Sequence, residues 1–176
     1  MKLELMSSKN LKEIFEFECD NRDFFERILP PRPQAYFEFS SFESLMQDIL
    51  KEQVAGECAM FIIRNDEEKM IGRINFSTIK KRNDDIVAEI GYRLAEVEQG
   101  KGHATKALAL AIEMGYQTYG INLVEAGTST ENIGSQKVLE KNGFIRVGQE
   151  KKVMQVNGKW LDGVLYAKKI TGEGHA

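Results

Sequence analysis

The sequence has few of the residues that build disulfide frameworks and metal centres. Its 176 residues include only two cysteines and two histidines. Cys19 and Cys58 do not have the spacing of metal ligands, and two cysteines are too few for a disulfide scaffold. Two reduced thiols are the simpler interpretation. We therefore expect no metal cofactor and a location in the cytoplasm.

Long hydrophobic runs and an excess of positive charge are also missing. No apolar stretch approaches the ~20 residues of a membrane span, and Glu4 interrupts the segment where a signal peptide would be apolar. The formal net charge is −3, whereas a nucleic-acid-binding domain needs a basic surface. We expect neither a membrane nor a nucleic-acid partner. The length fits one domain over residues 1–170, with a flexible tail over 171–176.

A glycine-bearing turn joins a predicted strand to a predicted helix at the centre of the chain. Residues 86–94 are rich in β-branched and aromatic side chains, which favours a strand. From Ala104 to Tyr119 apolar residues recur at three- and four-residue spacing, which indicates a helix. A helix that begins in this way offers unpaired backbone N–H groups to a phosphate. The turn reads Gln99, Gly100, Lys101, Gly102, His103, Ala104 and Thr105.

Three kinds of phosphate loop compete for this turn. A Walker A loop is excluded because no Gly-Lys-Ser/Thr string follows at the required spacing. A dinucleotide fingerprint would need a third glycine where Thr105 stands, and a βαβ context instead of the predicted antiparallel strands over 58–79. The pyrophosphate loop of acyl-CoA transferases, Gln/Arg-x-x-Gly-x-Gly/Ala, is met by Gln99, Gly102 and Ala104. We interpret the turn as the third kind.

The flanking segments predict a mixed α/β chain. An Asn157-Gly158 pair indicates a two-residue hairpin turn near the C-terminus, and Ser40 with Glu43 has the spacing of a capping box. Aromatic and acidic residues are frequent between Phe15 and Phe39; they indicate either a core with a solvated face or a wall of an acceptor cleft. Strands are predicted at 2–6, 58–64, 70–79, 122–129, 144–155 and 159–170, and helices at 10–19, 40–54 and 134–141.

Several separated motifs resemble the GNAT superfamily of acetyl-CoA-dependent N-acetyltransferases over nearly the whole chain. The resemblance is closer to the Rim-type branch, which acetylates the N-termini of ribosomal proteins. It implies an α/β (α+β) fold: a mixed, mostly antiparallel sheet, splayed after the fourth strand, with helices on both faces. The matching segments are the turn, Ala88 to Tyr92, Asn132 to Ser135, Leu139 to Phe144, Asn157 to Tyr166 and Pro30 to Pro33.

The resemblance also implies a cosubstrate and its contacts. Acetyl-CoA would be bound through Tyr92 and through the backbone at Leu94, which pairs with the pantetheine arm. Residues from Gln99 to Thr105 would hold the pyrophosphate, and Asn132 would reach the pantetheine amides. Asn132 is equally suited to cap the helix that follows. Both roles are compatible.

Acetyl transfer to an amine needs a group that protonates the departing thiolate and a base that takes the amine's proton. Many members of the superfamily use a tyrosine at the position of Leu139, which cannot donate. Ser135, one turn earlier, is our candidate acid; the alternative is a helix-start serine that satisfies backbone groups. Glu89 is our candidate base, or else an ion-pair partner of Arg93 or Arg73. His103 is better explained as a loop residue.

We therefore expect an N-acetyltransferase that acts on a primary amine, with a protein N-terminal α-amino group as the leading acceptor. One alternative keeps the fold and acetylates a small molecule, such as a polyamine, an amino acid derivative or an antibiotic. Another, prompted by Leu139, is a CoA-binding module without turnover. The sequence is compatible with a monomer or a homodimer.

Overall fold

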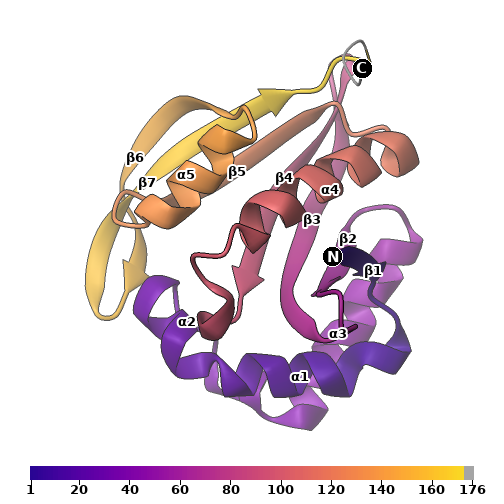
Figure 1. Ribbon diagram of the computed structural model, residues 1–176, viewed down its shortest axis with the longest axis vertical. Helices are drawn as coiled ribbons and strands as arrows, with labels where there is room; N and C mark the ends of the chain where they lie inside the picture. Colours follow the sequence, from indigo (N-terminus) through magenta and orange to yellow (C-terminus); the bar gives the residue numbers. More distant parts are fainter. Residues whose placement is uncertain (173–176) are drawn as a thin grey trace.

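The computed structural model describes residues 1–172. It is a seven-stranded sheet with helices packed against both faces (Figure 1). Most of the predicted tail, residues 173–176, lies outside the described residues. The elements in chain order are β1 (Lys2–Leu5), α1 (Leu11–Asp20), α2 (Arg22–Ile28), α3 (Phe39–Val54), β2 (Ala59–Arg64), β3 (Met70–Arg82), β4 (Asp85–Leu94), α4 (His103–Tyr119), β5 (Leu123–Ser129), α5 (Ile133–Lys141), β6 (Ile145–Val156) and β7 (Lys159–Lys169).

The sheet divides at its middle. The strand order is β1-β2-β3-β4-β5-β7-β6, and every neighbouring pair is antiparallel except β4 and β5. Those two strands pair in parallel only from Val87 to Glu89 on β4, opposite Leu123 to Glu125 on β5. Beyond these residues both strands continue without pairing to each other. This confirms the predicted splayed, mostly antiparallel sheet.

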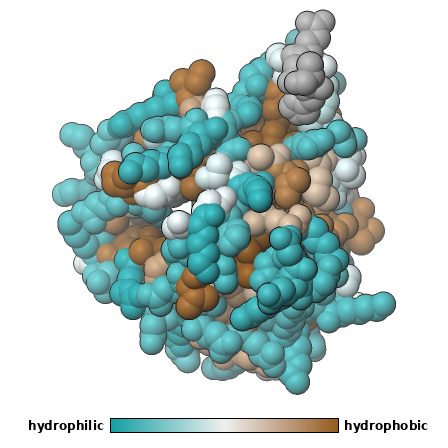
Figure 2. All heavy atoms as spheres, viewed as in Figure 1, coloured by the Kyte–Doolittle hydropathy of each residue, from teal (hydrophilic) through white to brown (hydrophobic). Residues whose placement is uncertain are grey.

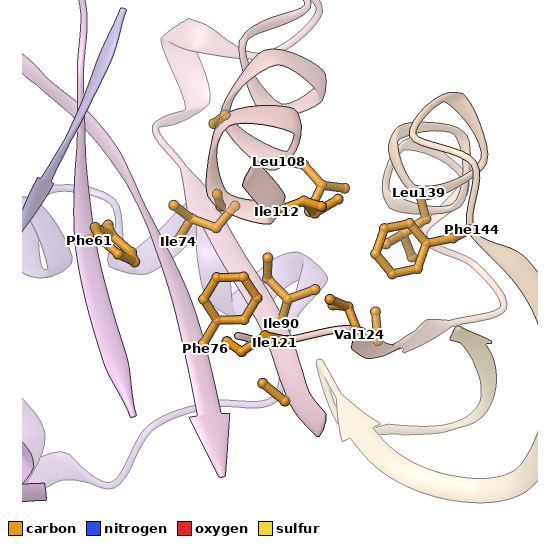
Figure 3. Packing of buried hydrophobic residues seen from close by; sticks show 14 of the residues in the cluster. Phe61, Ile74, Phe76, Ile90, Leu108, Ile112, Ile121, Val124, Leu139 and Phe144 are labelled. Atoms are coloured by element: carbon orange, nitrogen blue, oxygen red, sulfur yellow. The ribbon is translucent and has the colours of Figure 1, made fainter. Parts of the chain in front are cut away.

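Alternation along the strands produces two cores. One face of the sheet packs against α4 and α5 through residues such as Phe76, Ile90 and Leu108, which point toward one another in Figure 3. The opposite face packs against α1, α2 and α3 through Ile14, Phe42 and their neighbours. Most of the N-terminal aromatic residues lie in this second core. On the face drawn in Figure 2, hydrophilic side chains predominate and hydrophobic ones form separate patches.

Of two predictions made from short sequence motifs, the hairpin turn is confirmed and the capping box is wrong. Asn157 and Gly158 both have positive φ, 52° and 76°, as a two-residue hairpin turn requires. Helix α3 instead begins at Phe39 with Glu38 as its N-cap, so Ser40 lies inside the helix and forms no capping box. Among residues 1–172, no helix combines the length and the apolarity that crossing a membrane demands.

Gly115 allows α4 to approach the sheet closely. A Cβ at this position would lie 2.7 Å from Cζ of Phe76 and 2.8 Å from its Cε2, and the Phe76 ring is fully buried. We expect Gly115→Ala to lower the free energy of unfolding by about 1–3 kcal/mol, although alanine favours helix. Urea unfolding measures this change.

A control for this prediction is Gly134→Ala in α5, where the nearest atom to a new Cβ is 3.9 Å away. That substitution should be neutral or slightly stabilising because only helix propensity changes. Equal losses of stability in the two variants would contradict the proposed clash with Phe76.

Candidate active site

A cavity of about 460 Å³ opens where β4 and β5 part. Its floor and walls come from β4 between Ile90 and Leu94 and from β5 between Ala126 and Ser129. The turn before α4, one side of α5 from Gly134 to Lys141 including Leu139, the end of α2 and Met154 of the β6–β7 hairpin complete the lining. The divergence of two strands thus creates a site that continuous hydrogen bonding would have closed.

The turn before α4 has the backbone shape that its glycines predict. Gly100 and Gly102 have φ of 73° and 79°, and Gly102 is the N-cap of α4 without a side-chain cap. Because side chains rarely adopt such φ angles, glycine is needed at both positions. The amide of Gln99 donates to the Leu94 carbonyl oxygen at 3.0 Å and ties the turn to β4. The free N–H groups of the first helical turn remain available to an anion.

Six of the seven predicted turn residues line the cavity, and Lys101 does not. The Lys101 ammonium lies 3.4 Å from a carboxylate oxygen of Glu98, and the His103 ring nitrogen lies 3.3 Å from the same oxygen. Lys101 is half-exposed and pairs with a carboxylate that is only 16% exposed.

The start of α5 brings Asn132, Ser135 and Tyr92 together. Asn132 caps the helix by accepting a hydrogen bond from the Ser135 backbone N–H at 3.1 Å, and it also lines the cavity. The Tyr92 and Ser135 hydroxyls lie 2.9 Å apart, and the Tyr92 hydroxyl is also 3.3 Å from the Ser135 carbonyl oxygen. Burial raises the pKa of the Tyr92 phenol to about 12, although its hydrogen bond with Ser135 opposes the shift. Tyr92 is therefore a protonated donor at neutral pH.

Leu139, where many relatives have tyrosine, is buried in the core beside α4. A tyrosine hydroxyl nevertheless reaches the start of α5, from β4 instead of from the helix. Sequence reasoning assigned Tyr92 to cofactor binding and missed its contact with Ser135. Strand alternation puts Tyr92 on the α4 and α5 side, but it does not predict which serine the hydroxyl meets.

Glu89 lies at the point where β4 and β5 part, on the face opposite Tyr92. It is the last β4 residue paired with β5, its side chain is exposed, and it is absent from the cavity lining. Neither Arg73 nor Arg93 pairs with it. Both guanidinium groups bind Glu18 of α1, at 2.6 Å and 3.2 Å, so the ion-pair alternative for Glu89 is wrong.

The lining also includes charged residues that sequence reasoning missed. Lys137 and Lys141, one turn apart on α5, line the cavity together with the glycine turn, and Arg93 lines it near α2. The i,i+4 spacing puts the two lysines on one face of α5, but neither lies three or four residues from Asn132 or Ser135, so spacing did not connect them to the site. Asn142, expected only to end α5, donates to the Thr105 carbonyl oxygen at 3.1 Å and so fixes α5 against the start of α4.

Known proteins share both the sequence pattern and this architecture. The family described as an acetyltransferase (GNAT) domain matches residues 1–145. A probable N-acetyltransferase, YjcK of Bacillus subtilis strain 168, is 30% identical over 152 residues, covering 86% of this chain and 83% of the relative.

Two solved structures extend the comparison. The ribosomal-protein-S5-alanine acetyltransferase of Vibrio fischeri has a TM-score of 0.88 at 25% identity, covering 97% of this chain and 93% of that one. The spermidine N-acetyltransferase of Vibrio cholerae, in complex with CoA and spermine, has a TM-score of 0.80 at 19% identity, covering 96% and 94%. The family match, the splayed sheet and the glycine turn agree. The chain belongs to the GNAT family and is an acetyl-CoA-dependent N-acetyltransferase.

Proposed function

We propose that the protein transfers the acetyl group of acetyl-CoA to the N-terminal α-amino group of a protein, as a Rim-type enzyme. The observation that supports this most is the cavity at the β4–β5 divergence, with the glycine turn at one end and Ser135 beside it. The full-length similarity to an S5-alanine acetyltransferase favours a protein N-terminus as acceptor.

The coenzyme would lie along the cavity. Backbone N–H groups at the start of α4 would hold the pyrophosphate oxygens, and Lys137 and Lys141 would supply positive charge from α5. The backbone of β4 at Leu94, unpaired on the β5 side, would hydrogen-bond the pantetheine arm as an added strand does. Tyr92 and Asn132 would contact the same arm.

The transfer step forms one bond and breaks another. The neutral amine attacks the carbonyl carbon of the thioester, a C–N bond forms, and the C–S bond breaks. The nitrogen loses one proton, and the departing sulfur receives one from the Ser135 hydroxyl. When Ser135 donates to sulfur, its oxygen can accept a hydrogen bond from Tyr92, 2.9 Å away. The proton released by the nitrogen returns to Ser135 through water, so protons balance.

Glu89 would receive the amine's proton through water, because its exposed side chain is outside the cavity lining. We expect Glu89→Gln to lower kcat about 100-fold and to alter the ascending limb of the pH–rate profile. Glu125→Gln, in the adjacent position on β5, is the control. If the pH–rate profile of Glu89→Gln is the same as that of the wild type, Glu89 is not the base.

Release of free CoA thiol in the presence of different amines tests the proposed function. An alanine-starting ribosomal peptide should release thiol, and spermidine should release it far more slowly. Faster release with spermidine would favour a small-molecule acceptor. Absence of release with every amine, combined with CoA binding, would favour a binding module.

A further inference from the structure

Arg93 lines the cavity where α2 borders it, with its guanidinium over the Phe25 ring. It lines the main cavity and also a recess of about 10 Å³ beside α2, so the two spaces meet at this side chain. Pro30 borders both spaces as well. An acceptor that approaches the thioester from the α2 side therefore passes the guanidinium of Arg93.

The charge around Arg93 is not balanced. Glu18 is 1% exposed and serves both Arg73 and Arg93, so two guanidinium groups share one carboxylate. The third partner of this cluster, the Tyr36 hydroxyl, accepts a hydrogen bond from Arg73 and is not a carboxylate. One positive charge thus remains at the wall of the cavity. Burial lowers the pKa of Arg93; the Glu18 carboxylate opposes this shift, and the nearby positive charge of Arg32 adds to it.

Arg93 has hydrogen-bonding capacity left. Its side chain is 14% exposed, is held 4.9 Å from the Phe25 ring centre, and uses Nη1 for Glu18. The other guanidinium nitrogens have no partner among the described residues. Among the described residues, the buried side-chain N or O atom without a partner is Oδ1 of Asn75, so no nitrogen of Arg93 is both buried and unpaired. The free N–H groups of Arg93 therefore face accessible space.

Carboxylates are scarce in the same region. Among the described residues, no aspartate or glutamate lines the main cavity, whereas Arg93, Lys137 and Lys141 do. The two glutamates of the recess are already paired, Glu18 as above and Glu26 with Arg22 at 2.9 Å. Arg32 also lines the recess and contacts the Tyr36 ring instead of a carboxylate. A polycationic amine would meet like charge here.

We propose that Arg93, supported by Arg32, binds a carboxylate on the acceptor, so the enzyme selects amines that carry an acidic group near the reacting nitrogen. Within the proposed function, which this inference rests on, the acceptor is a protein N-terminus with an acidic residue close to its first position. A charge-assisted hydrogen bond of this kind changes affinity about 10- to 100-fold.

Matched peptides test this directly. Tetrapeptides that begin with alanine carry glutamate at the second or third position, and their partners carry glutamine there; all have amidated C-termini, so only one charge differs. For the wild type we expect kcat/KM to be at least about tenfold higher for one or both glutamate peptides. In Arg93→Gln the ratio should fall toward one, and in Arg93→Lys it should be partly retained.

Arg27→Gln is the matched control, because Arg27 lies on α2, pairs with the exposed Glu96 and does not line either space. It should keep the wild-type ratio. A wild type that prefers the glutamine peptides or spermidine overturns the inference, as does a ratio that survives in Arg93→Gln. The comparison of glutamate and glutamine peptides with the wild-type enzyme tests the inference even if a variant fails to fold.

Binding separates failure of this inference from failure of the proposed function. The N-acetylated glutamate and glutamine peptides are titrated calorimetrically into the wild-type protein with CoA. Tighter binding of the glutamate peptide supports the charge selection even if no amine releases thiol. Absence of thiol release would refute only the proposed function. Equal binding refutes the selection even if thiol is released.

Discussion

Glu18→Gln should lower the free energy of unfolding by about 3–5 kcal/mol, the range for breaking a buried ion pair from one side. Glu18 is 1% exposed, and its carboxylate faces Arg73, whose side chain is 6% exposed, and Arg93. Glutamine keeps the shape but leaves two guanidinium groups without a counter-charge. The position of the urea unfolding midpoint measures the loss.

Two companion variants distinguish lost charge from lost packing. Glu26→Gln removes a half-buried partner of Arg22 on α2 and should cost about 1 kcal/mol or less. Glu18→Met combined with Arg73→Met and Arg93→Met replaces the whole cluster by apolar side chains and should recover much of the stability lost in Glu18→Gln. If Glu18→Gln is no more destabilising than Glu26→Gln, the buried cluster does not hold α1 to the sheet.

This cluster also illustrates what the sequence could not reveal. Glu18 is 55 residues from Arg73 and 75 from Arg93. Spacing within a helix or strand predicts neighbours only a few residues away, so Glu89, on the same strand as Arg93, was the more obvious partner. The pairing required knowledge of which helix covers which face of the sheet.

Features that depend on local chemistry were predicted well. The glycine turn, the Asn157-Gly158 hairpin and the helix cap at Asn132 follow from φ preferences and nearby hydrogen bonds. The start of α3 was not predicted, because a capping-box spacing at Ser40 does not require the backbone to enter the helix there. Tertiary packing around Phe42 sets that boundary instead.

The contact between Tyr92 and Ser135 joins residues 43 positions apart, and we expect a loss of activity there as large as the one at Glu89. Ser135→Ala should lower kcat about 100-fold, the size of one general-acid contribution. Tyr92→Phe should lower it about tenfold, because the phenol acts by donating to Ser135 and not to the substrate. Steady-state thiol release with saturating acetyl-CoA measures both.

The double variant decides whether the two hydroxyls form one unit. If Tyr92 acts only through Ser135, Tyr92→Phe should have no further effect once Ser135 is alanine, so the two losses should not add. Tyr116→Phe, on the exposed side of α4, is the control and should retain activity. Additive losses would mean that Tyr92 contacts the reacting atoms independently.

The pH dependence of turnover is a second, independent test of the proposed role of Tyr92 as hydrogen-bond donor to Ser135. A raised folded-state pKa means that the neutral phenol is favoured, so Tyr92 stays protonated as pH rises through 10 and ionises only near 12. Turnover at saturating substrate should therefore not fall between pH 8 and about 10. A decline in the wild type across that interval that is absent in Tyr92→Phe would show that the phenol ionises early and that burial does not protect it. A wild-type rate that does not fall over the pH range in which the amine loses its proton would instead fit a Tyr92 phenol that stays protonated when the neutral amine is present.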